Sequence, residues 1–307
     1  MRSATFDFQT VNTLTFFVRK ITPEFGQTIK GIVLIAHGLS EHSGRYVRFA
    51  EALVKAGFGV YVHDQRGHGK TAKRTDAVTL SKGDFEGMVD DVAKLRDMAE
   101  ECSQGVPIFL FGHSLGTVIV RKYIEKFGGR SVRGVVLSGP LRLEQNEVDA
   151  FAQLVDERLL KTGREAVDAE LNAAFFGHFN DAFMPARTSF EWLSRDHAEV
   201  DRYEHDLLCG QPQTIGFYEE FIAGYDTEHR DRISRINSGL PILLLSGDCD
   251  PVSANGQSAF RIAADCRAAG IANVDVKIYN GARHELLNET NRSQVTDDIV
   301  AWLEKQL

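Results

Sequence analysis

The chain has 307 residues, of which 43% are hydrophobic, so it is long enough to bury a substantial core in one large domain with an insertion or in two domains. Its formal net charge of -8 and its pI of about 5.7 argue against a general affinity for nucleic acids or anionic membranes, which requires basic patches. The sequence shows no secretory leader, no apolar run of the roughly 18 residues that span a bilayer, and no paired C-x-x-C spacing among its four cysteines. We therefore expect a cytoplasmic protein with reduced thiols, no metal site and no nucleic-acid partner.

The first half of the chain predicts alternating strands and helices. Residues 5–10 and 13–20 alternate apolar and polar side chains, which is typical of a half-buried antiparallel pair of strands. Four continuously apolar runs follow, as expected of strands covered on both faces: residues 31–36, 59–63, 106–112 and 132–139. Stretches such as 84–103 place apolar side chains at helical spacing between these runs, which predicts parallel β-α units.

No strand-like apolar run is recognised between residue 140 and the runs at 240–247 and 274–281, which precede a final helix. We therefore predict an α/β fold with a mostly parallel central sheet flanked by helices. In this interpretation a helical lid, residues 141–239, interrupts a core formed by residues 1–140 and 240–307.

Within this predicted lid, residues 164–176 and 213–236 are helix-like. The lid also clusters the aromatic side chains of Phe175, Phe176, Phe179 and Phe183. An apolar channel for an acyl chain would use such residues, and so would an ordinary lid core.

The pentapeptide G-H-S-L-G, residues 112–116, places Ser114 between the run at 106–112 and a helical segment. A serine that ends a strand and opens a helix, with a glycine two residues away on either side, is the pattern of a nucleophile elbow. A side chain at Gly112 or Gly116 would crowd the neighbouring strand and helix on so sharp a turn. We therefore predict that Ser114 is a nucleophile.

A serine nucleophile needs a histidine base and an acid, which follow it in the chain in this arrangement. His284 is the histidine that comes after the elbow and outside the predicted lid, just past the last predicted strand. The segment after the run at 240–247 offers two acids, Asp248 and Asp250. We favour Asp250 because Pro251 biases the residue before it toward an extended backbone, while Asp248 has an alternative role in stabilising the loop.

Two backbone amides are expected to bind the oxyanion that forms on an attacked carbonyl. The elbow supplies the Leu115 N–H, and the loop after the run at 31–36 supplies the Leu39 N–H. Other polar residues nearby have more than one interpretation. We interpret His68 as structural, and Glu41, His42 and Arg45 either hold a substrate headgroup or begin a helix.

These motifs together resemble the monoglyceride lipase and lysophospholipase-like branch of the serine α/β-hydrolases. The similar segments are HGLSEHSGRY at 37–46, DQRGHGKT at 64–71, GHSLG at 112–116, GDCDPV at 247–252 and NGARHELLNE at 280–289. The resemblance implies the α/β-hydrolase fold, an ester hydrolase and a lid that lines an acyl-binding channel. Its G-x-x-D acid motif also supports Asp250. The chain departs from the family at Ser40 and Thr117, where glycine is common.

We therefore expect hydrolysis of small-molecule carboxylic esters, monoacylglycerols or lysophospholipid-like lipids, through an acyl-enzyme on Ser114 and without a cofactor. The lid mouth is expected to contact lipid surfaces transiently, and the sequence does not predict an oligomeric state. Two alternatives remain. One is an aminopeptidase of the same fold that acts on short peptides, and the other is a lid-gated binding protein with a silent triad.

Overall fold

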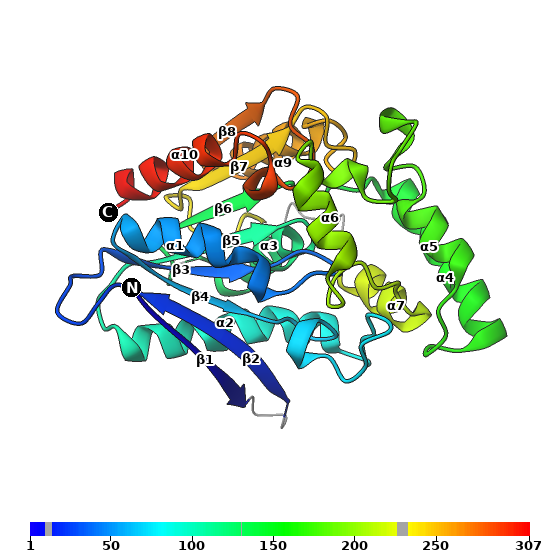
Figure 1. Cartoon of the computed structure of the whole chain (residues 1–307), viewed down its shortest axis with the longest axis horizontal. Coiled ribbons are helices and arrows are strands. Elements are labelled where there is room, and N and C mark those ends of the chain that lie inside the picture. The colour runs from blue at the N-terminus through cyan, green and yellow to red at the C-terminus, as the bar shows by residue number, and fades with distance from the viewer. Residues whose placement is uncertain (10–13, 130, 226–232) are drawn as a thin grey trace.

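The computed structural model describes residues 1–9, 14–129, 131–225 and 233–307. Its eight strands form one sheet with the order β1-β2-β4-β3-β5-β6-β7-β8 (Figure 1). The strands are β1 (Arg2–Gln9), β2 (Thr15–Thr22), β3 (Gly31–Ala36), β4 (Phe58–His63), β5 (Ile108–His113), β6 (Gly134–Ser138), β7 (Ile242–Gly247) and β8 (Val274–Tyr279).

The direction of each strand follows the pattern of its side chains. β1 pairs antiparallel with β2, and β2 pairs antiparallel with β4, whereas all the other neighbours are parallel. Every residue of β3, β4, β5 and β7 is buried, while β1 lies at the edge and is mostly exposed. The predicted antiparallel pair and mostly parallel sheet are confirmed.

Helices cover both faces of the sheet. The core helices are α1 (Val47–Lys55), α2 (Asp84–Cys102), α3 (Leu115–Phe127), α9 (Gln257–Ala268) and α10 (Arg292–Lys305). Alternate residues of β3 point to opposite sides, so that Leu34 packs in the cluster with α2, α3 and α9, and Ile35 packs in the cluster with α1 and α10. The core therefore has three layers, with the sheet in the middle.

Within the described residues, helices α4 to α7 lie between β6 and β7 in the sequence, and in Figure 1 they gather on the right, at one end of the sheet. They are α4 (Gln145–Thr162), α5 (Ala169–Phe176), α6 (His197–His205) and α7 (Ile215–Gly224). Two of them are shorter than predicted. The Asp168 side chain accepts a hydrogen bond from the Leu171 N–H and starts α5 at residue 169 rather than 164. α7 ends at Gly224, and part of the predicted segment 213–236 lies outside the described residues.

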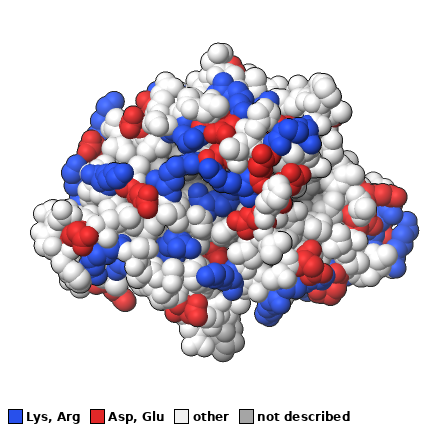
Figure 2. Space-filling model, viewed as in Figure 1, with Lys and Arg blue, Asp and Glu red and all other residues white. Residues whose placement is uncertain are grey.

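No helix in the described part of the chain combines the length and apolarity needed to cross a lipid bilayer. On the face shown in Figure 2, basic and acidic side chains are interspersed rather than separated into large patches.

Candidate active site

Ser114 occupies the turn between β5 and α3, with a φ of 51° and a ψ of -118°. Residues with side chains rarely adopt a positive φ, and such strain is found where a site requires it. A methyl group at Gly112 would lie 2.5 Å from the Gly116 carbonyl oxygen, and one at Gly116 would collide with the Ala36 carbonyl oxygen. Because both obstacles are backbone atoms, Gly112 allows β5 and α3 to meet at this turn, and Gly116 allows α3 to approach the end of β3.

His284 and Asp250 form a buried pair in the loops that follow β8 and β7. His284 Nδ1 lies 3.0 Å from both carboxylate oxygens of Asp250, and the two side chains are 2% and 0% exposed. The carboxylate accepts the Nδ1–H, which leaves the lone pair of the imidazole on Nε2. Asp248 has a different role. Its Oδ1 accepts a hydrogen bond from the Gly281 N–H at 2.6 Å, which joins the loop after β7 to the turn after β8.

The charge of Asp250 raises the pKa of His284 although the side chain is buried. Burial alone would lower the pKa of His284, but the Asp250 carboxylate, with smaller contributions from Glu285 and Glu41, raises the pKa above its ordinary value. The other buried histidines of the core behave in the opposite way. Burial lowers the pKa of His37 and His63 to about 4 and that of His68 to about 3. His284 is therefore the one of these four histidines that is suited to accept a proton near neutral pH.

The loop after β3 passes beside the elbow. A methyl group at Gly38 would lie 3.3 Å from the Cβ of Ser114, so Leu39 follows a residue that already contacts the elbow. Leu39, Leu115, Ser114 and His284 all line one cavity. The structure thus brings together the residues that the sequence pattern predicted separately as nucleophile, base and oxyanion donors.

A buried charge network supports both loops. The Arg45 guanidinium binds the Glu41 carboxylate at 3.0 Å and makes two hydrogen bonds to Glu285, the residue after His284. Glu41 also accepts hydrogen bonds from the Gly38 N–H and the Tyr46 hydroxyl. Glu41 and Arg45, which the sequence left between a headgroup role and a helix start, therefore connect the oxyanion loop to the histidine loop. Sequence reasoning missed Glu285, although its position directly after His284 was a signal.

The DQRGHG segment has a structural arrangement. Asp64 accepts hydrogen bonds from the N–H groups of Ser43 and Lys70, and the Arg66 guanidinium pairs with two aspartates of α2. His68 Nδ1 lies 2.8 Å from the Arg66 carbonyl oxygen, and His68 does not line the catalytic cavity. These contacts give His68 the structural position that the sequence predicted.

The cavity that Ser114 and His284 line, which is the candidate catalytic cavity, has a volume of about 400 Å³ and is mostly apolar. Phe175, Phe176 and Phe179 line it, as expected of an acyl channel, whereas Phe183 lies outside with the Arg283 guanidinium 4.1 Å from the centre of its ring. The remaining apolar lining was not predicted because it comes from many separate segments: Leu141, Phe190, Trp192, Leu193, Phe221 and Val252. A second cavity of about 440 Å³ shares a wall with the first, formed by Leu141, Phe175, Phe179, Phe221 and Val252.

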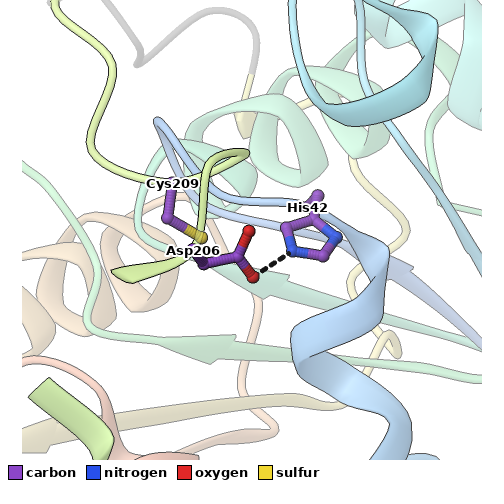
Figure 3. A group of neighbouring side chains, drawn as sticks. All are labelled: His42, Asp206 and Cys209. Carbon is purple, nitrogen blue, oxygen red and sulfur yellow. Dashed lines mark hydrogen bonds and ion pairs between the residues drawn. The ribbon is translucent and has the colours of Figure 1, made fainter. Parts of the chain in front are cut away.

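His42, Asp206 and Cys209 form a cluster that has the residue types of a metal site (Figure 3). Their ligand atoms lie within 4.8 Å of one another, and His42 Nε2 is 2.9 Å from Asp206. However, His42 Nδ1 accepts a hydrogen bond from the Gly44 N–H, so the neutral ring carries its proton on Nε2 and donates it to Asp206. This arrangement suits a hydrogen-bonded pair between the loop after β3 and the end of α6 better than a cation ligand set.

Comparison with known proteins agrees with this geometry. Residues 27–291 match the family model described as serine aminopeptidase, S33. The chain is 28% identical over 282 residues to a monoacylglycerol lipase of Mycolicibacterium smegmatis, covering 91% of this chain and 89% of the relative. It is also 28% identical to human monoglyceride lipase, covering 91% of this chain and 84% of that protein. A thermostable carboxyl esterase from Bacillus coagulans, solved with glycerol, superposes with a TM-score of 0.89 at 26% identity, and 99% of each chain is covered. The predicted resemblance to monoglyceride lipases is confirmed, and the chain belongs to the serine aminopeptidase S33 family of hydrolases.

Proposed function

We propose that this chain is a serine hydrolase of carboxylic esters that acts on monoacylglycerols, with Ser114, His284 and Asp250 as its catalytic residues. The observation that carries the proposal is the buried His284–Asp250 pair, at 3.0 Å, in a cavity that also holds Ser114 on a strained turn. The similarity to monoacylglycerol lipases over about nine-tenths of the chain supports the same substrate class.

In the mechanism, the Ser114 hydroxyl attacks the ester carbonyl while His284 Nε2 takes its proton. Asp250 stabilises the imidazolium that forms, and the backbone N–H groups of Leu39 and Leu115 bind the oxyanion. His284 then protonates the leaving alcohol, which departs and leaves an acyl group on Ser114. Water repeats the cycle with His284 as the base and releases the fatty acid.

The charges of the cavity favour a neutral headgroup. Among the residues that line the cavity in the described chain, none is lysine or arginine, and the two carboxylates are Glu41 and Glu285. A lysophospholipid would place its phosphate in a cavity with acidic and without basic side chains, which is unfavourable. A glyceryl ester carries no charge, and we therefore propose monoacylglycerols ahead of lysophospholipids.

The same charges argue against the aminopeptidase alternative, which requires a free carboxylate for the substrate ammonium group. Both oxygens of Glu41 and both oxygens of Glu285 already accept hydrogen bonds within the protein. None of the lid carboxylates Glu144, Glu147, Asp149, Asp156 and Glu157 lines the catalytic cavity. An apolar acyl chain fits this lining better than a peptide amino terminus does.

We further propose that residues 141–239 act as a lid over the core formed by residues 1–140 and 240–307. Support comes from α4–α7, which follow β6 at one end of the sheet, and from the lid residues Phe175, Phe179 and Trp192, which line the cavity. Leu207 and Met184 are 88% and 67% exposed, so the lid offers apolar side chains for transient contact with a lipid surface.

The test measures the release of fatty acid from a medium-chain monoacylglycerol, with lysophosphatidylcholine and an aminoacyl-naphthylamide in parallel, for the wild type and Ser114→Ala. We expect monoacylglycerol hydrolysis that Ser114→Ala abolishes, together with fluorophosphonate labelling of the wild type alone. Cleavage of the amide alone would favour the peptidase. A folded wild type that neither hydrolyses an ester nor reacts with the probe would favour a binding protein with a silent triad.

A further inference from the structure

Ser40 of the oxyanion loop has a conformation that its own residue type does not favour. Its φ is 53°, and it is only 5% exposed. Glycine adopts a positive φ without strain, whereas a residue with a side chain does not. A serine in this position therefore requires compensating contacts from its surroundings.

Those contacts come from the lid. The Ser40 carbonyl oxygen accepts hydrogen bonds from the Tyr203 hydroxyl and the Gly210 N–H, each at 2.9 Å. The Ser40 hydroxyl donates to the Gln211 carbonyl oxygen at 2.8 Å and accepts from Gln213 Nε2 at 2.6 Å. Four hydrogen bonds thus connect one residue of the oxyanion loop to residues 203–213, which we call the lid clamp.

A neighbouring contact extends this junction. His42, two residues further along the same loop, points toward Asp206 of the lid clamp and lies 2.9 Å from it (Figure 3). The Arg45 guanidinium lies 4.8 Å from the centre of the Tyr203 ring. The lid clamp therefore contacts the loop from Ser40 to Arg45 through both polar and aromatic groups.

We propose that the lid clamp holds the oxyanion loop in its active conformation, with Ser40 and Tyr203 as positioning residues. The inference rests on the proposed function, in which the Leu39 N–H binds the oxyanion. The second donor, the Leu115 N–H, belongs to the first residue of α3, and none of the hydrogen bonds of the lid clamp described above involves it. Only the Leu39 donor is therefore coupled to the docking of the lid, and an undocked lid leaves the oxyanion with one well-placed donor.

The experiment compares Ser40→Gly and Tyr203→Phe with the wild type and with Tyr279→Phe as a matched control. Ser40→Gly removes the hydroxyl contacts but accepts the positive φ. Tyr203→Phe removes one hydroxyl–oxygen hydrogen bond of 2.9 Å from a tyrosine that is 5% exposed. Tyr279→Phe removes a hydrogen bond of the same length, to Asp298, from a tyrosine of β8 that is 3% exposed and does not line the cavity.

Three quantities are measured: kcat and KM on a monoacylglycerol, the affinity for a trifluoromethyl ketone with the same acyl chain, and the affinity for the non-hydrolysable ether analogue. The ketone forms a tetrahedral oxyanion with Ser114 and so reports the oxyanion site, whereas the ether reports ground-state binding. We expect Ser40→Gly and Tyr203→Phe each to lower kcat and ketone affinity in parallel, by about 3- to 10-fold, which corresponds to the loss of one or two hydrogen bonds. Ser40 and Tyr203 also line the cavity, so a direct contact with substrate would lower ether affinity as well. We expect KM and ether affinity to stay unchanged, and Tyr279→Phe to match the wild type in all three.

Equal ketone affinities for the wild type and both variants would overturn the proposal. So would an equal loss of affinity for the ketone and for the ether, because that would show an effect on ground-state binding. Ketone binding requires attack by Ser114 but no turnover. A wild type that binds the ketone but hydrolyses no ester would therefore refute the proposed function, while the comparison of ketone affinities would still decide the role of the lid clamp.

Discussion

Replacing Asp250 with asparagine removes the charge of the proposed acid while keeping its shape. Asp250 Oδ1 accepts the Val252 N–H at 2.9 Å, and both carboxylate oxygens face His284 Nδ1 at 3.0 Å. In Asp250→Asn the amide oxygen is expected to stay on the Val252 N–H, so that the amide NH₂ turns toward Nδ1. Nδ1 must then accept a hydrogen bond, and the proton of the neutral imidazole moves to Nε2, where it prevents His284 from acting as a base.

The size of the effect follows from these contacts. The loss of a hydrogen bond to a charged group costs about 1.5–3 kcal/mol, or roughly 10- to 150-fold in rate. The wrong tautomer adds to this, so that the total fall in kcat is about 10³- to 10⁴-fold. The pH profile also changes. Catalysis needs neutral His284, so activity rises with pH through the His284 pKa, which Asp250 raises. Without that carboxylate the lowering effect of burial remains, and the acid limb of kcat/KM moves to lower pH.

The assay is the pH dependence of monoacylglycerol hydrolysis for the wild type, Asp250→Asn and Asp248→Asn, with thermal unfolding to check the fold. Asp248→Asn is the matched control because an asparagine Oδ1 can still accept the Gly281 N–H, so its activity should stay within about twofold of the wild type. The reasoning fails if Asp248→Asn is the more damaging change. It also fails if Asp250→Asn leaves the acid limb where it is.

Three other predictions follow from packing and burial. Gly116→Ala forces a methyl group onto the Ala36 carbonyl oxygen, so we expect it to lower the free energy of unfolding by about 1–3 kcal/mol and to reduce activity. The control is Gly59→Ala, whose methyl group would meet only ordinary contacts at 3.6 Å. In chemical denaturation it should change the free energy of unfolding by less than about 1 kcal/mol. Both ring nitrogens of His63 are buried and have no hydrogen-bond partner among the described residues, and burial lowers the pKa of His63 to about 4. The unfolded chain therefore binds a proton first as the pH falls below about 6.5. His63→Leu should therefore raise the free energy of unfolding by about 1 kcal/mol at pH 7 and by about 2 kcal/mol more at pH 5. The prediction is contradicted if the denaturation midpoints of variant and wild type differ by the same amount at both pH values. Phe175→Ala opens the wall between the two cavities, and each methylene that newly enters the second cavity should improve kcat/KM by up to about fourfold. In a series of monoacylglycerols, the acyl-chain length with the highest kcat/KM should therefore become longer. An unchanged chain-length profile would show that the wall does not limit the acyl chain.

The central sheet and the elbow could be predicted because their signals are local. The run before Gly112 is apolar at every position, as a strand buried on both faces requires, and the residues after Gly116 have helical spacing. Ser114 therefore had to lie at the junction. The preference for Asp250 over Asp248 also used a local signal, the proline that follows it, and Asp250 is the acid that pairs with His284.

The contacts of the lid could not be predicted because they join residues that are distant in the sequence. Ser40 is 163 residues from Tyr203 and 171 residues from Gln211, its hydrogen-bond partners, and no periodicity reports such a pairing. The sequence also could not show which aromatic side chains of residues 175–183 line the cavity. Phe179 and Phe183 are four residues apart, but only Phe179 lines the cavity, because Phe183 belongs to a short turn that faces Arg283.

The environment of His284 indicates why burial here serves chemistry and not only stability. His63, like His284, is fully buried, but burial lowers the pKa of His63 while the pKa of His284 is raised. The difference lies in the partner, because Asp250 faces the His284 ring directly with both of its oxygens. Glu41 and Glu285 raise the pKa of His284 further, although Arg45 binds both of them. The same carboxylates hold the loop after β3 and the loop of His284. In the proposed mechanism, the charges that prepare His284 to accept a proton therefore also fix the groups that bind the oxyanion. A change in this network should therefore alter proton transfer and oxyanion binding together, whereas loss of the hydrogen bonds of the lid clamp to Ser40 is expected to alter oxyanion binding.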